Sequence, residues 1–443
     1  MNTRSTNGRA RLLPSYSVLR LAGRLALPVL FAAASVRAEP REIASSFTLD
    51  QAVSTALRDN AQLRAMRAKW EAMQERPAQE RTLPNPMLAV KSGNSADNFR
   101  FPNTQETRVE IEQTFPWFGK LALRGKMATK EAEAMQREYE TMAREIVMMV
   151  KETYFDLAGI QQSCAITRGD QAVLEQMLKV TENQYATGQR SQQDAVKAQS
   201  EITMLKQKLL DYDQEEAVLK AKLAQLLNTD IAPTLIVTAP LEQLAAELPA
   251  LLAAAGTARP EIKKAEADIQ RSRYERDLMQ KEFYPDYRVG VEYGYMQGGF
   301  SDFSGSDNLV MLTISFDLPI WQKKYRAGVR AAEKMIEASQ ATLESTRRQV
   351  TFDVQDATFK LHTAQKTLEL YRKELLPQAE LRFKTSEAAY RNGNGEFLDL
   401  LESERFRLNA RVMTAMAEAN LGMQAARLER AVGMELPKTE EKK

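Results

Sequence analysis

The sequence predicts a mainly α-helical chain, built as a tandem repeat, that contributes four strands to a membrane β-barrel. A motif with the spacing Glu-x-x-Tyr-x-x-Gly-x5-Asp occupies residues 182–194 and recurs without a gap at 387–399. Each copy lies at a break between two long helical patterns with coiled-coil spacing. Each pair of helices follows two strand-like runs in which apolar and polar residues alternate. A whole-chain duplication of this kind indicates that the architecture itself carries the function.

Residues 1–38 have the pattern of a cleaved secretory signal. They carry several arginines and no acid, followed by an apolar stretch from Leu25 to Ala34 and small residues before Glu39. We therefore expect cleavage after Ala38. The alternative is an N-terminal membrane anchor, although the apolar stretch is shorter than the about 20 residues that a spanning helix needs.

Composition excludes several classes of protein. The chain holds 61 Lys and Arg against 59 Asp and Glu, and because all charged residues of the signal are basic, the mature chain is acidic. No basic face indicates binding to nucleic acid. The single cysteine, Cys164, excludes a disulfide framework, and its place in an apolar stripe predicts a packed side chain. With one histidine (His362, expected to be exposed) and no glycine-rich phosphate loop, we expect no enzyme activity, no cofactor and no metal site.

The two repeats share one order of elements: a helix, a strand hairpin and a long helical hairpin. In the first repeat, residues 39–228, we expect these elements at about 48–81, 83–116 and 119–228. In the second repeat, residues 241–433, we expect them at about 258–283, 285–319 and 322–433. Residues 229–240 form the expected linker, and residues 434–443 form a polar tail.

Local signals mark the ends of these elements. Thr48 with Gln51 forms a capping box at the start of the first helix, which we expect to run unbroken to about Arg81. Prolines follow the first helix of each repeat, where they end the helix and begin extended chain. Pro377 is the one interruption that we expect in the long helix of the second repeat.

The strand runs have one apolar and one polar face. Runs 106–116, 287–296 and 308–318 alternate clearly, and 87–93 does so more weakly. Such runs of about ten residues, with an aromatic-rich apolar face, are typical of outer-membrane barrel strands that face lipid outside and water inside. The charged residues expected to face the lumen, as ordinary polar lining, are Arg108, Glu110, Glu112, Arg288 and Glu292.

A small soluble antiparallel sheet packed on the helices gives the same local pattern and stays open as an alternative. If the strands span a membrane, four of them cannot close a barrel, because the smallest closed barrels have about eight strands. Several chains must then share one barrel.

The long helical patterns run to Tyr185 and Tyr390, and each approaches about 100 Å at about 1.5 Å per residue. Apolar residues keep 4-3 steps along them, for example from Val350 to Leu375. Each pattern turns back at a glycine, Gly188 or Gly393, which permits the positive φ of a helix end. We expect these helices to pack side by side, since they have no globular core to surround.

In this order and duplication the chain resembles the outer-membrane efflux proteins of the TolC type over essentially the whole mature sequence. The matching segments are Phe47-Thr-Leu-Asp-Gln-Ala-Val, Leu83-Pro-Asn-Pro, Glu112-Gln-Thr-Phe-Pro-Trp-Phe-Gly-Lys120, the two Tyr-x-x-Gly turns and Ala431-Val-Gly-Met-Glu-Leu-Pro437. Each segment is a soft motif alone, and their order and spacing make the resemblance specific. The Phe-Pro-Trp-Phe-Gly-Lys run and the length look most similar to members paired with heavy-metal exporters of the resistance-nodulation-division class.

The resemblance implies a homotrimer with a twelve-stranded barrel in the outer membrane and a hollow helical barrel in the periplasm. It implies passive export, in which a periplasmic adaptor (membrane fusion) protein docks onto the duct and an inner-membrane pump supplies the energy. The helical turns would face the adaptor, which places the docking tips at Tyr185, Gly188, Gln189, Arg190, Ser191, Tyr390, Gly393, Asn394, Gly395 and Glu396.

The resemblance also implies an acidic periplasmic constriction at Asp399 and Glu402, with Asp194 at the position equivalent to Asp399. A trimer would bring three copies of each acid near one axis, where a negative ring attracts cations. The alternative is a solvated helix face near an N-terminus, where carboxylates are favoured in any case.

The sequence leaves alternatives for the cargo and for the architecture. Heavy-metal cations are the expected cargo, and a multidrug or protein export duct of the same family is the alternative. A soluble periplasmic coiled-coil adaptor explains the helices but not the apolar strand faces. The 19 methionines suggest a relay for soft metal ions, but several of them, such as Met135, Met142 and Met149, occupy coiled-coil positions where methionine usually fills a core.

Overall fold

The computed structural model describes residues 47–93, 106–188, 191–231, 237, 247–297 and 306–435, which belong to one unit of the chain. The expected signal with its cleavage site after Ala38 lies outside the described residues, as do most of the linker and of the polar tail. Across the described helices, none holds an apolar stretch sufficient to cross a bilayer.

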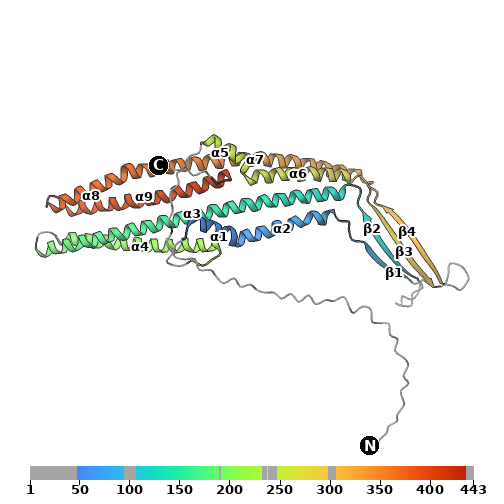
Figure 1. The fold of residues 1–443 in the computed structure, drawn as a ribbon, viewed down its shortest axis with the longest axis horizontal. Coiled ribbons are helices and arrows are strands. Elements are labelled where there is room, and N and C mark those ends of the chain that lie inside the picture. The colour runs from blue at the N-terminus through green and yellow to red at the C-terminus, as the bar shows by residue number, and fades with distance from the viewer. Residues whose placement is uncertain are drawn as a thin grey trace, which may run out of the picture. The chain divides into compact units, whose positions relative to one another are not determined.

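The two halves of the chain have the same order of elements (Figure 1). The first half consists of α1 (Leu49–Asp59), α2 (Ala61–Arg81), β1 (Met87–Gly93), β2 (Glu106–Phe115), α3 (Lys120–Ala186) and α4 (Gln192–Leu227). The second half consists of α5 (Leu248–Ala258), α6 (Pro260–Lys281), β3 (Tyr287–Gln297), β4 (Ser306–Phe316), α7 (Gln322–Leu370), a π-helical turn (Tyr371–Leu375), α8 (Leu376–Arg391) and α9 (Phe397–Val432). The predicted duplication of helices and strands is therefore present in the structure.

The prediction of one unbroken helix to Arg81 was wrong, because the chain breaks at Asn60. The backbone of Asn60 is extended (φ −60°, ψ 125°), and its side chain accepts a hydrogen bond from the Leu63 N–H at 3.0 Å, which caps α2. An asparagine that bonds to nearby backbone offers the chain an alternative to continuing the helix. The second half breaks in the same way before Pro260, so that α5 precedes the helix that the sequence predicted.

Pro377 interrupts the long helix of the second repeat as expected, but the interruption takes the form of a π-helical turn just before it. Proline has no N–H and its ring crowds the carbonyl four residues earlier. The wider π-helical turn at 371–375 accommodates this without ending the helix, and α8 continues directly from Leu376.

The four strands form one antiparallel sheet in the order β1-β2-β3-β4, and no helix packs across either face of it in the described part of the chain (Figure 1). One face carries exposed apolar side chains, namely Leu88, Val90, Ile111, Val291, Tyr293, Val310, Leu312, Ile314 and Phe316. A soluble sheet would bury such a face against the helices. The arrangement excludes that alternative and agrees with strands that face lipid.

The helices of each half share an apolar core of the same design. In the first half α1, α3 and α4 meet around a cluster of buried side chains that includes Ala56, Val150 and Leu223. In the second half α5, α7 and α9 meet around a cluster that includes Ala255 and Val354. Neither short helix has enough apolar surface to form a core alone, so each depends on the long hairpin of its own half.

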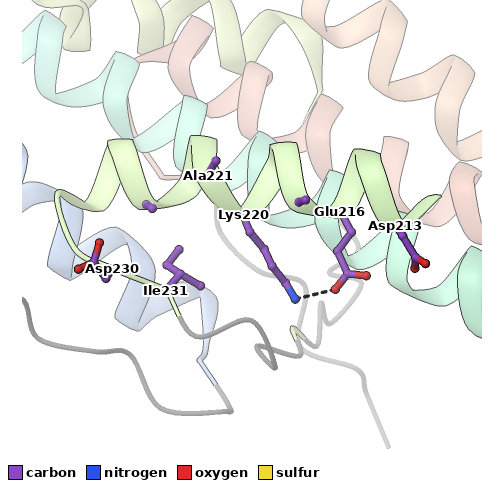
Figure 2. Close-up of a pocket in the computed structure, with 8 residues that line it drawn as sticks. Asp213, Glu216, Lys220, Ala221, Asp230 and Ile231 are labelled. Atoms are coloured by element: carbon purple, nitrogen blue, oxygen red, sulfur yellow. Dashed lines mark ion pairs between the residues drawn. The ribbon is translucent and has the colours of Figure 1, made fainter. Parts of the chain in front are cut away.

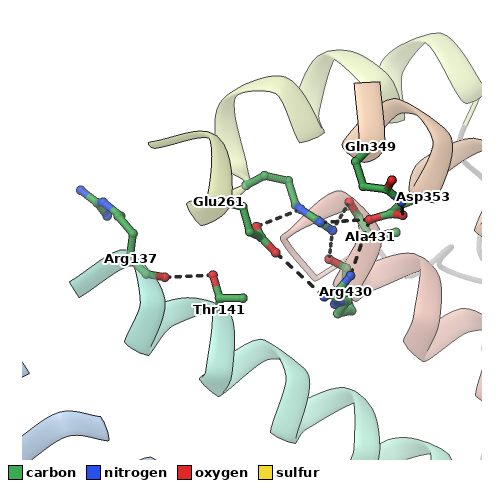
Figure 3. A network of polar contacts seen from close by, with 8 residues as sticks. Arg137, Thr141, Glu261, Gln349, Asp353, Arg430 and Ala431 are labelled. Carbon is green, nitrogen blue, oxygen red and sulfur yellow. Dashed lines mark hydrogen bonds and ion pairs between the residues drawn. The ribbon is translucent and has the colours of Figure 1, made fainter. Parts of the chain in front are cut away.

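A buried polar residue joins the short helices of each half to the end of its return helix. In the first half the Asn60 side-chain amide donates to the Leu226 carbonyl at 2.8 Å. In the second half Arg259, only 3% exposed, donates to the carbonyls of Arg430 and Ala431, both at 3.0 Å (Figure 3). The carbonyls at a helix C-terminus have no partner within the helix, and a cation there is further favoured by the helix dipole.

Arg259 also holds α7 and the start of α6. Its guanidinium lies 3.2 Å from an Asp353 carboxylate oxygen and 3.0 Å from one of Glu261. One side chain therefore binds three helices, whereas its counterpart Asn60 binds two.

We predict that Arg259→Ala destabilises the protein more than Asn60→Ala. Loss of the Asn60 cap and its bond to α4 costs about 1–2 kcal/mol. Loss of Arg259 leaves the buried carbonyls of Arg430 and Ala431 without this donor and removes the ion pairs to Asp353 and Glu261, which together cost about 3–5 kcal/mol. Thermal unfolding of the purified protein in detergent, followed by circular dichroism, measures both changes. Arg58→Ala, which removes an exposed ion pair to Asp59, is the control with little effect; equal melting temperatures for all three variants would contradict the prediction.

Candidate functional site

The charged residues on the polar face of the sheet form a connected set of ion pairs. Arg108 lies 3.1 Å from Glu292, and Lys91 lies 2.6 Å from Glu110 and 3.4 Å from Glu292. Glu292 is 6% exposed and sits between the two cations. The predicted lumen residues thus share one face, and opposite charges largely neutralise one another there.

The second part of this set lies nearer the helices. Arg288 pairs with Asp317 and lies 4.0 Å from Glu112. Gly290 lies opposite Glu112, on the same face, and leaves room above the strand for these long side chains. All five predicted lumen residues therefore belong to this one polar face.

A buried lysine fixes the corner where strand passes into helix. Lys120 is 1% exposed, and its ammonium group lies 2.8 Å from Asp286 and 3.4 Å from Glu282. Asp286 also accepts a hydrogen bond from the Trp117 N–H at 2.7 Å, and the Trp117 ring stacks on Tyr284 at 5.3 Å. The corner after β2 is thereby tied to the corner before β3.

The two Tyr-x-x-Gly turns lie at the ends of the helical hairpins that are remote from the sheet (Figure 1). Gly188 (φ +71°) and Gly393 (φ +78°) adopt the left-handed conformation that a side chain disfavours. Gly395 is required for a different reason, because a Cβ atom there would come within 2.9 Å of the Tyr390 nitrogen. Of the other predicted tip residues, Gln189 and Arg190 lie outside the described residues.

The two tips differ in the role of their tyrosines. Tyr185 is exposed, as expected of a docking residue. Tyr390 is buried instead: its ring lies against Phe397, and its hydroxyl donates to the Gln184 side chain at 2.9 Å. Its side chain therefore joins the second tip to α3 and does not form part of an outer docking surface. Ser191 caps α4 through the Gln193 N–H, while Asn394 and Glu396 are exposed.

Asp399 and Glu402 lie in the first two turns of α9 with exposed side chains. Residues three apart project from one helix face, and the alternate face holds the buried Phe397, Leu400 and Leu401. No ion pair of either acid occurs among the described residues. Asp194, the first-half equivalent, is half-buried at the start of α4. Asp399 and Glu402 thus both point outward from α9, whereas Asp194 lies on α4, in the other helical hairpin.

A buried charge cluster lies further along α9, where α3, α8 and α9 meet. Glu404 (1% exposed) lies 2.6 Å from Arg407, and Arg407 lies 3.6 Å from Asp170 of α3. Arg411 bridges Asp170 at 3.6 Å and Glu380 of α8 at 2.6 Å. The Arg407 guanidinium also stacks over the Phe383 ring at 3.8 Å.

This cluster contains three acids and two arginines, and its polar atoms are incompletely paired. Within the described part of the chain, one carboxylate oxygen each of Asp170 and Glu404 has no hydrogen-bond partner. Burial raises the pKa of Glu404 to about 7, and burial likewise raises the pKa of Asp170. Glu404 therefore changes its protonation state near neutral pH inside the helical packing.

This cluster was not predicted from the sequence, although a signal for it is present there. Glu404 falls at an apolar position of the 4-3 stripe that runs from Phe397 through Leu401 to Leu408. A charged residue at such a position predicts a buried polar contact, but not which helix supplies the partner.

The described residues hold no group of histidine, cysteine or acidic side chains that could bind a metal ion. An open hollow of about 660 Å³ beside α4 is lined by Asp213, Glu216, Lys220 and Asp230 (Figure 2). Glu216 pairs with Lys220 at 2.7 Å and Asp213 with Arg168 at 3.1 Å. Two of the three carboxylates that line the hollow are therefore already paired with cations, and the third, Asp230, is exposed.

Sequence comparison gives one family and several relatives. The profile of the family described as outer membrane efflux protein matches residues 52–229 and 251–434. The chain is 22% identical over 385 residues to the cobalt-zinc-cadmium resistance protein CzcC of Cupriavidus metallidurans, covering 84% of this chain and 87% of that protein. It is 22% identical over 314 residues to the pyoverdine export outer membrane protein OpmQ of Pseudomonas putida, covering 69% of this chain and 65% of that protein.

Structure comparison agrees with the family match. The outer membrane protein VceC of Vibrio cholerae superposes with a TM-score of 0.72 at 18% identity, covering 88% of this chain and 97% of that one. At this identity the likeness shows the fold alone, and it confirms the predicted fold class.

We predict that the stability of the helical region falls as the pH rises from about 5 to about 8. Folding raises the pKa of Glu404 to about 7. Between about pH 5 and 8 the folded protein therefore binds more protons than the unfolded chain, and its stability is lost as the pH rises through the pKa of Glu404 in the folded state. Glu404→Gln should flatten this dependence. Melting temperatures across the pH range test it, helped by the presence of only one histidine in the chain. The exposed Glu402→Gln serves as the matched control, and an unchanged pH slope in Glu404→Gln would refute the assignment.

Proposed function

The chain belongs to the outer membrane efflux protein family, and we propose that it forms the trimeric exit duct of a tripartite export system. The protein is an outer-membrane efflux channel by family. Beyond this, we propose the number of chains in the duct, the site at which the adaptor docks, the constriction and the cargo. The observation that carries it is the uncovered apolar face of a four-stranded sheet that passes directly into helices far longer than a soluble core needs.

The geometry of the sheet supports a barrel shared by several chains, and membership of the family supports three. Four strands cannot close a barrel, whereas three chains supply twelve. The ion-paired face with Arg108, Glu110 and Glu292 then lines the lumen, because the opposite face is apolar and suits lipid. Because opposite charges neutralise each other on this face, the barrel is a wide polar passage with little preference for ions of one sign.

We therefore assign the ion selectivity of the duct to its periplasmic end. Asp399 and Glu402 project together from α9 beside the second tip, and neither forms an ion pair among the described residues, although the charge of Arg405 acts on Glu402. Three copies around one axis form a negative ring in a narrow aperture, which favours cations. This supports metal cations as cargo.

The adaptor docks at the tips with Gly188 and Gly393. Exposed residues there include Tyr185, Asn394 and Glu396. The adaptor couples the duct to an inner-membrane pump, since the chain has no site for an energy source among its described residues.

The cargo is proposed from the chain's relatives and from the acidic ring. The relative that matches over most of both chains is named for resistance to cobalt, zinc and cadmium. A second relative is named for pyoverdine export, which keeps a cargo of that kind as the competing candidate. An acidic ring favours the cation.

Deletion of the gene in its own host tests the proposed function. We expect greater sensitivity to divalent metal salts, restored by the full chain, with unchanged tolerance of organic antibiotics. Sensitivity to organic compounds alone would replace the metal cargo and leave the duct, whereas a soluble periplasmic monomer would remove the duct.

We predict that Gly393→Pro abolishes transport without preventing membrane insertion. Proline requires a negative φ where Gly393 has +78°, and it removes the hydrogen bond from the Gly393 N–H to the Tyr390 carbonyl at 3.1 Å. The distorted tip should lose adaptor binding. Metal resistance and the amount of protein in outer-membrane fractions measure the two effects. Lys384→Ala, on an exposed part of α8, should retain resistance; full resistance in Gly393→Pro would contradict the docking assignment.

We predict that Asp399→Asn combined with Glu402→Gln reduces cation selectivity several-fold. The substitutions remove the negative ring but keep the size of the side chains. Reversal potentials in planar bilayers under a salt gradient measure the change. A matched double variant of exposed acids on α7, Glu333→Gln with Glu337→Gln, should leave selectivity as in the wild type. If both double variants behave alike, the acidic pair does not line the pore.

A further inference from the structure

A chain of charged side chains links α8 to α3 across α9. It begins at Glu380 of α8, which lies 2.6 Å from Arg411 of α9. Arg411 lies 3.6 Å from Asp170 of α3, and Arg407 lies 3.6 Å from the same carboxylate. Arg407 then pairs with Glu404 at 2.6 Å. Because α3 packs against α9 and α9 packs against α8, these five residues (the Glu404 cluster) join three helices at one level.

The Glu404 cluster contains one more acid than arginines. With all of its groups ionised it has a net negative charge, and the uptake of one proton makes it neutral. Asp170, Glu404 and Arg407 are buried, so water does not screen the inner part of the cluster. An unbalanced charge is costly in such surroundings, and two carboxylates that share one arginine repel each other. The balance of charges therefore favours one bound proton.

The hydrogen bonds of the buried atoms indicate the same proton. Within the described part of the chain, Glu404 Oε2 and Asp170 Oδ2 have no hydrogen-bond partner. One Arg407 nitrogen contacts both carboxyl groups, at 2.6 Å and 3.6 Å, so the two groups are neighbours. Two ionised carboxylates can only accept hydrogen bonds, whereas a protonated carboxyl group can also donate one. A proton on Glu404 therefore supplies the donor that the two groups lack, and burial raises the pKa of Glu404 to about 7.

The other charged groups near this level are exposed or paired elsewhere. On α3, Arg168 pairs with an exposed aspartate of α4 at 3.1 Å. Glu201 of α4 pairs with Arg405 of α9. On α8, Arg382 and Lys384 are exposed. The charges that act on Glu404 are those of its own cluster, namely Arg407, Asp170 and Arg411.

The helix that carries Glu380 follows an irregular joint. The π-helical turn at 371–375 and Pro377 separate α7 from the rest of α8, and Glu380 is the first residue of the cluster beyond them. Such π-helical turns and prolines are the usual places where a long helix bends. Beyond this joint, the contacts that hold α8 to the first half include the Glu404 cluster and the hydrogen bond from Tyr390 to Gln184. A change of charge in the cluster therefore acts on a helix that can bend.

We propose that the Glu404 cluster is a pH-dependent switch for the position of the α8–α9 hairpin against α3. With Glu404 protonated the cluster is neutral, and the hairpin packs closely against α3. Loss of the proton leaves an excess negative charge between Asp170 and Glu404, which moves the hairpin away from α3 and widens the duct at its periplasmic end. The effect on the duct rests on the proposed function, because α9 also carries the acidic pair Asp399 and Glu402.

Distances between spin labels on the full-length protein in detergent test the switch. In a Cys164→Ala background, labels are attached at Lys179→Cys of α3 and Lys384→Cys of α8, both of which are exposed positions. As the pH rises from about 5.5 to about 8.5, the population with the longer distance should rise several-fold, with a midpoint at about 7. Glu404→Gln keeps the size of the side chain and holds the cluster neutral, so the short distance should persist at every pH.

Two further variants distinguish a titrating switch from a purely structural role. Asp170→Asn removes the second buried anion, so the remaining acids match the arginines in number. Glu404 should then ionise more readily, and the midpoint should fall by about one pH unit or more. Glu175→Gln removes an exposed carboxylate of α3 and should leave the midpoint as in the wild type. A pH-dependent distance that persists in Glu404→Gln, or a midpoint that Asp170→Asn does not move, would overturn the switch.

Conductance in planar bilayers over the same pH range separates the switch from the duct. Wild-type conductance should rise with pH, and the conductance of Glu404→Gln should stay at the value of the protonated state. A conducting protein whose label distances do not change with pH would overturn the switch and leave the proposed function. A protein that forms no channel but shows the expected change in distance would overturn the duct and leave the switch.

Discussion

The constraint on which the rest of the structure depends is that, within the described part of the chain, the sheet has an apolar face without a cover and two outer edges without partners. A bilayer accepts the apolar face but not unpaired backbone groups, which cost several kcal/mol each when no water reaches them. Closure with other copies satisfies both conditions. The position of the helices follows, because each strand hairpin continues through a short corner into a long helix, and a ring of strands therefore imposes a ring of helices.

Because the two halves are duplicated, the architecture is built from few distinct kinds of contact. The two halves differ in the chemistry of the residues at equivalent positions. Asn60 and Arg259 both join a short helix to the carbonyls that end the return helix, but only Arg259 also binds carboxylates. Asp286 and Asn85 start equivalent strands, one with a charge and one without. At both positions the second half makes an ionic contact within the chain that the first half does not make.

The long helices combine continuous apolar packing with one buried cluster of charged side chains. Glu404 and Asp170 lie where a coiled-coil stripe would place apolar side chains, and their arginine partners satisfy them only in part. Buried ionic groups of this kind add little to stability and make the packing dependent on geometry. They lie between the tips and the rest of the hairpins, where burial raises the pKa of Glu404.

The sequence by itself determined the features that depend on local periodicity and backbone chemistry. These include the duplicated order of elements, the apolar and polar faces of the strands, the glycine turns at Gly188 and Gly393, the packed Cys164 and the exposed His362. Only the tertiary structure decided which faces meet. The break at Asn60 depends on its bond to a carbonyl of α4, the burial of Tyr390 depends on Gln184 of α3, and the charge cluster joins Asp170 to Glu404 from different halves. A helical pattern shows which residues share a face. The partner of that face is set by packing between segments far apart in the chain, and a local pattern carries no information about such packing.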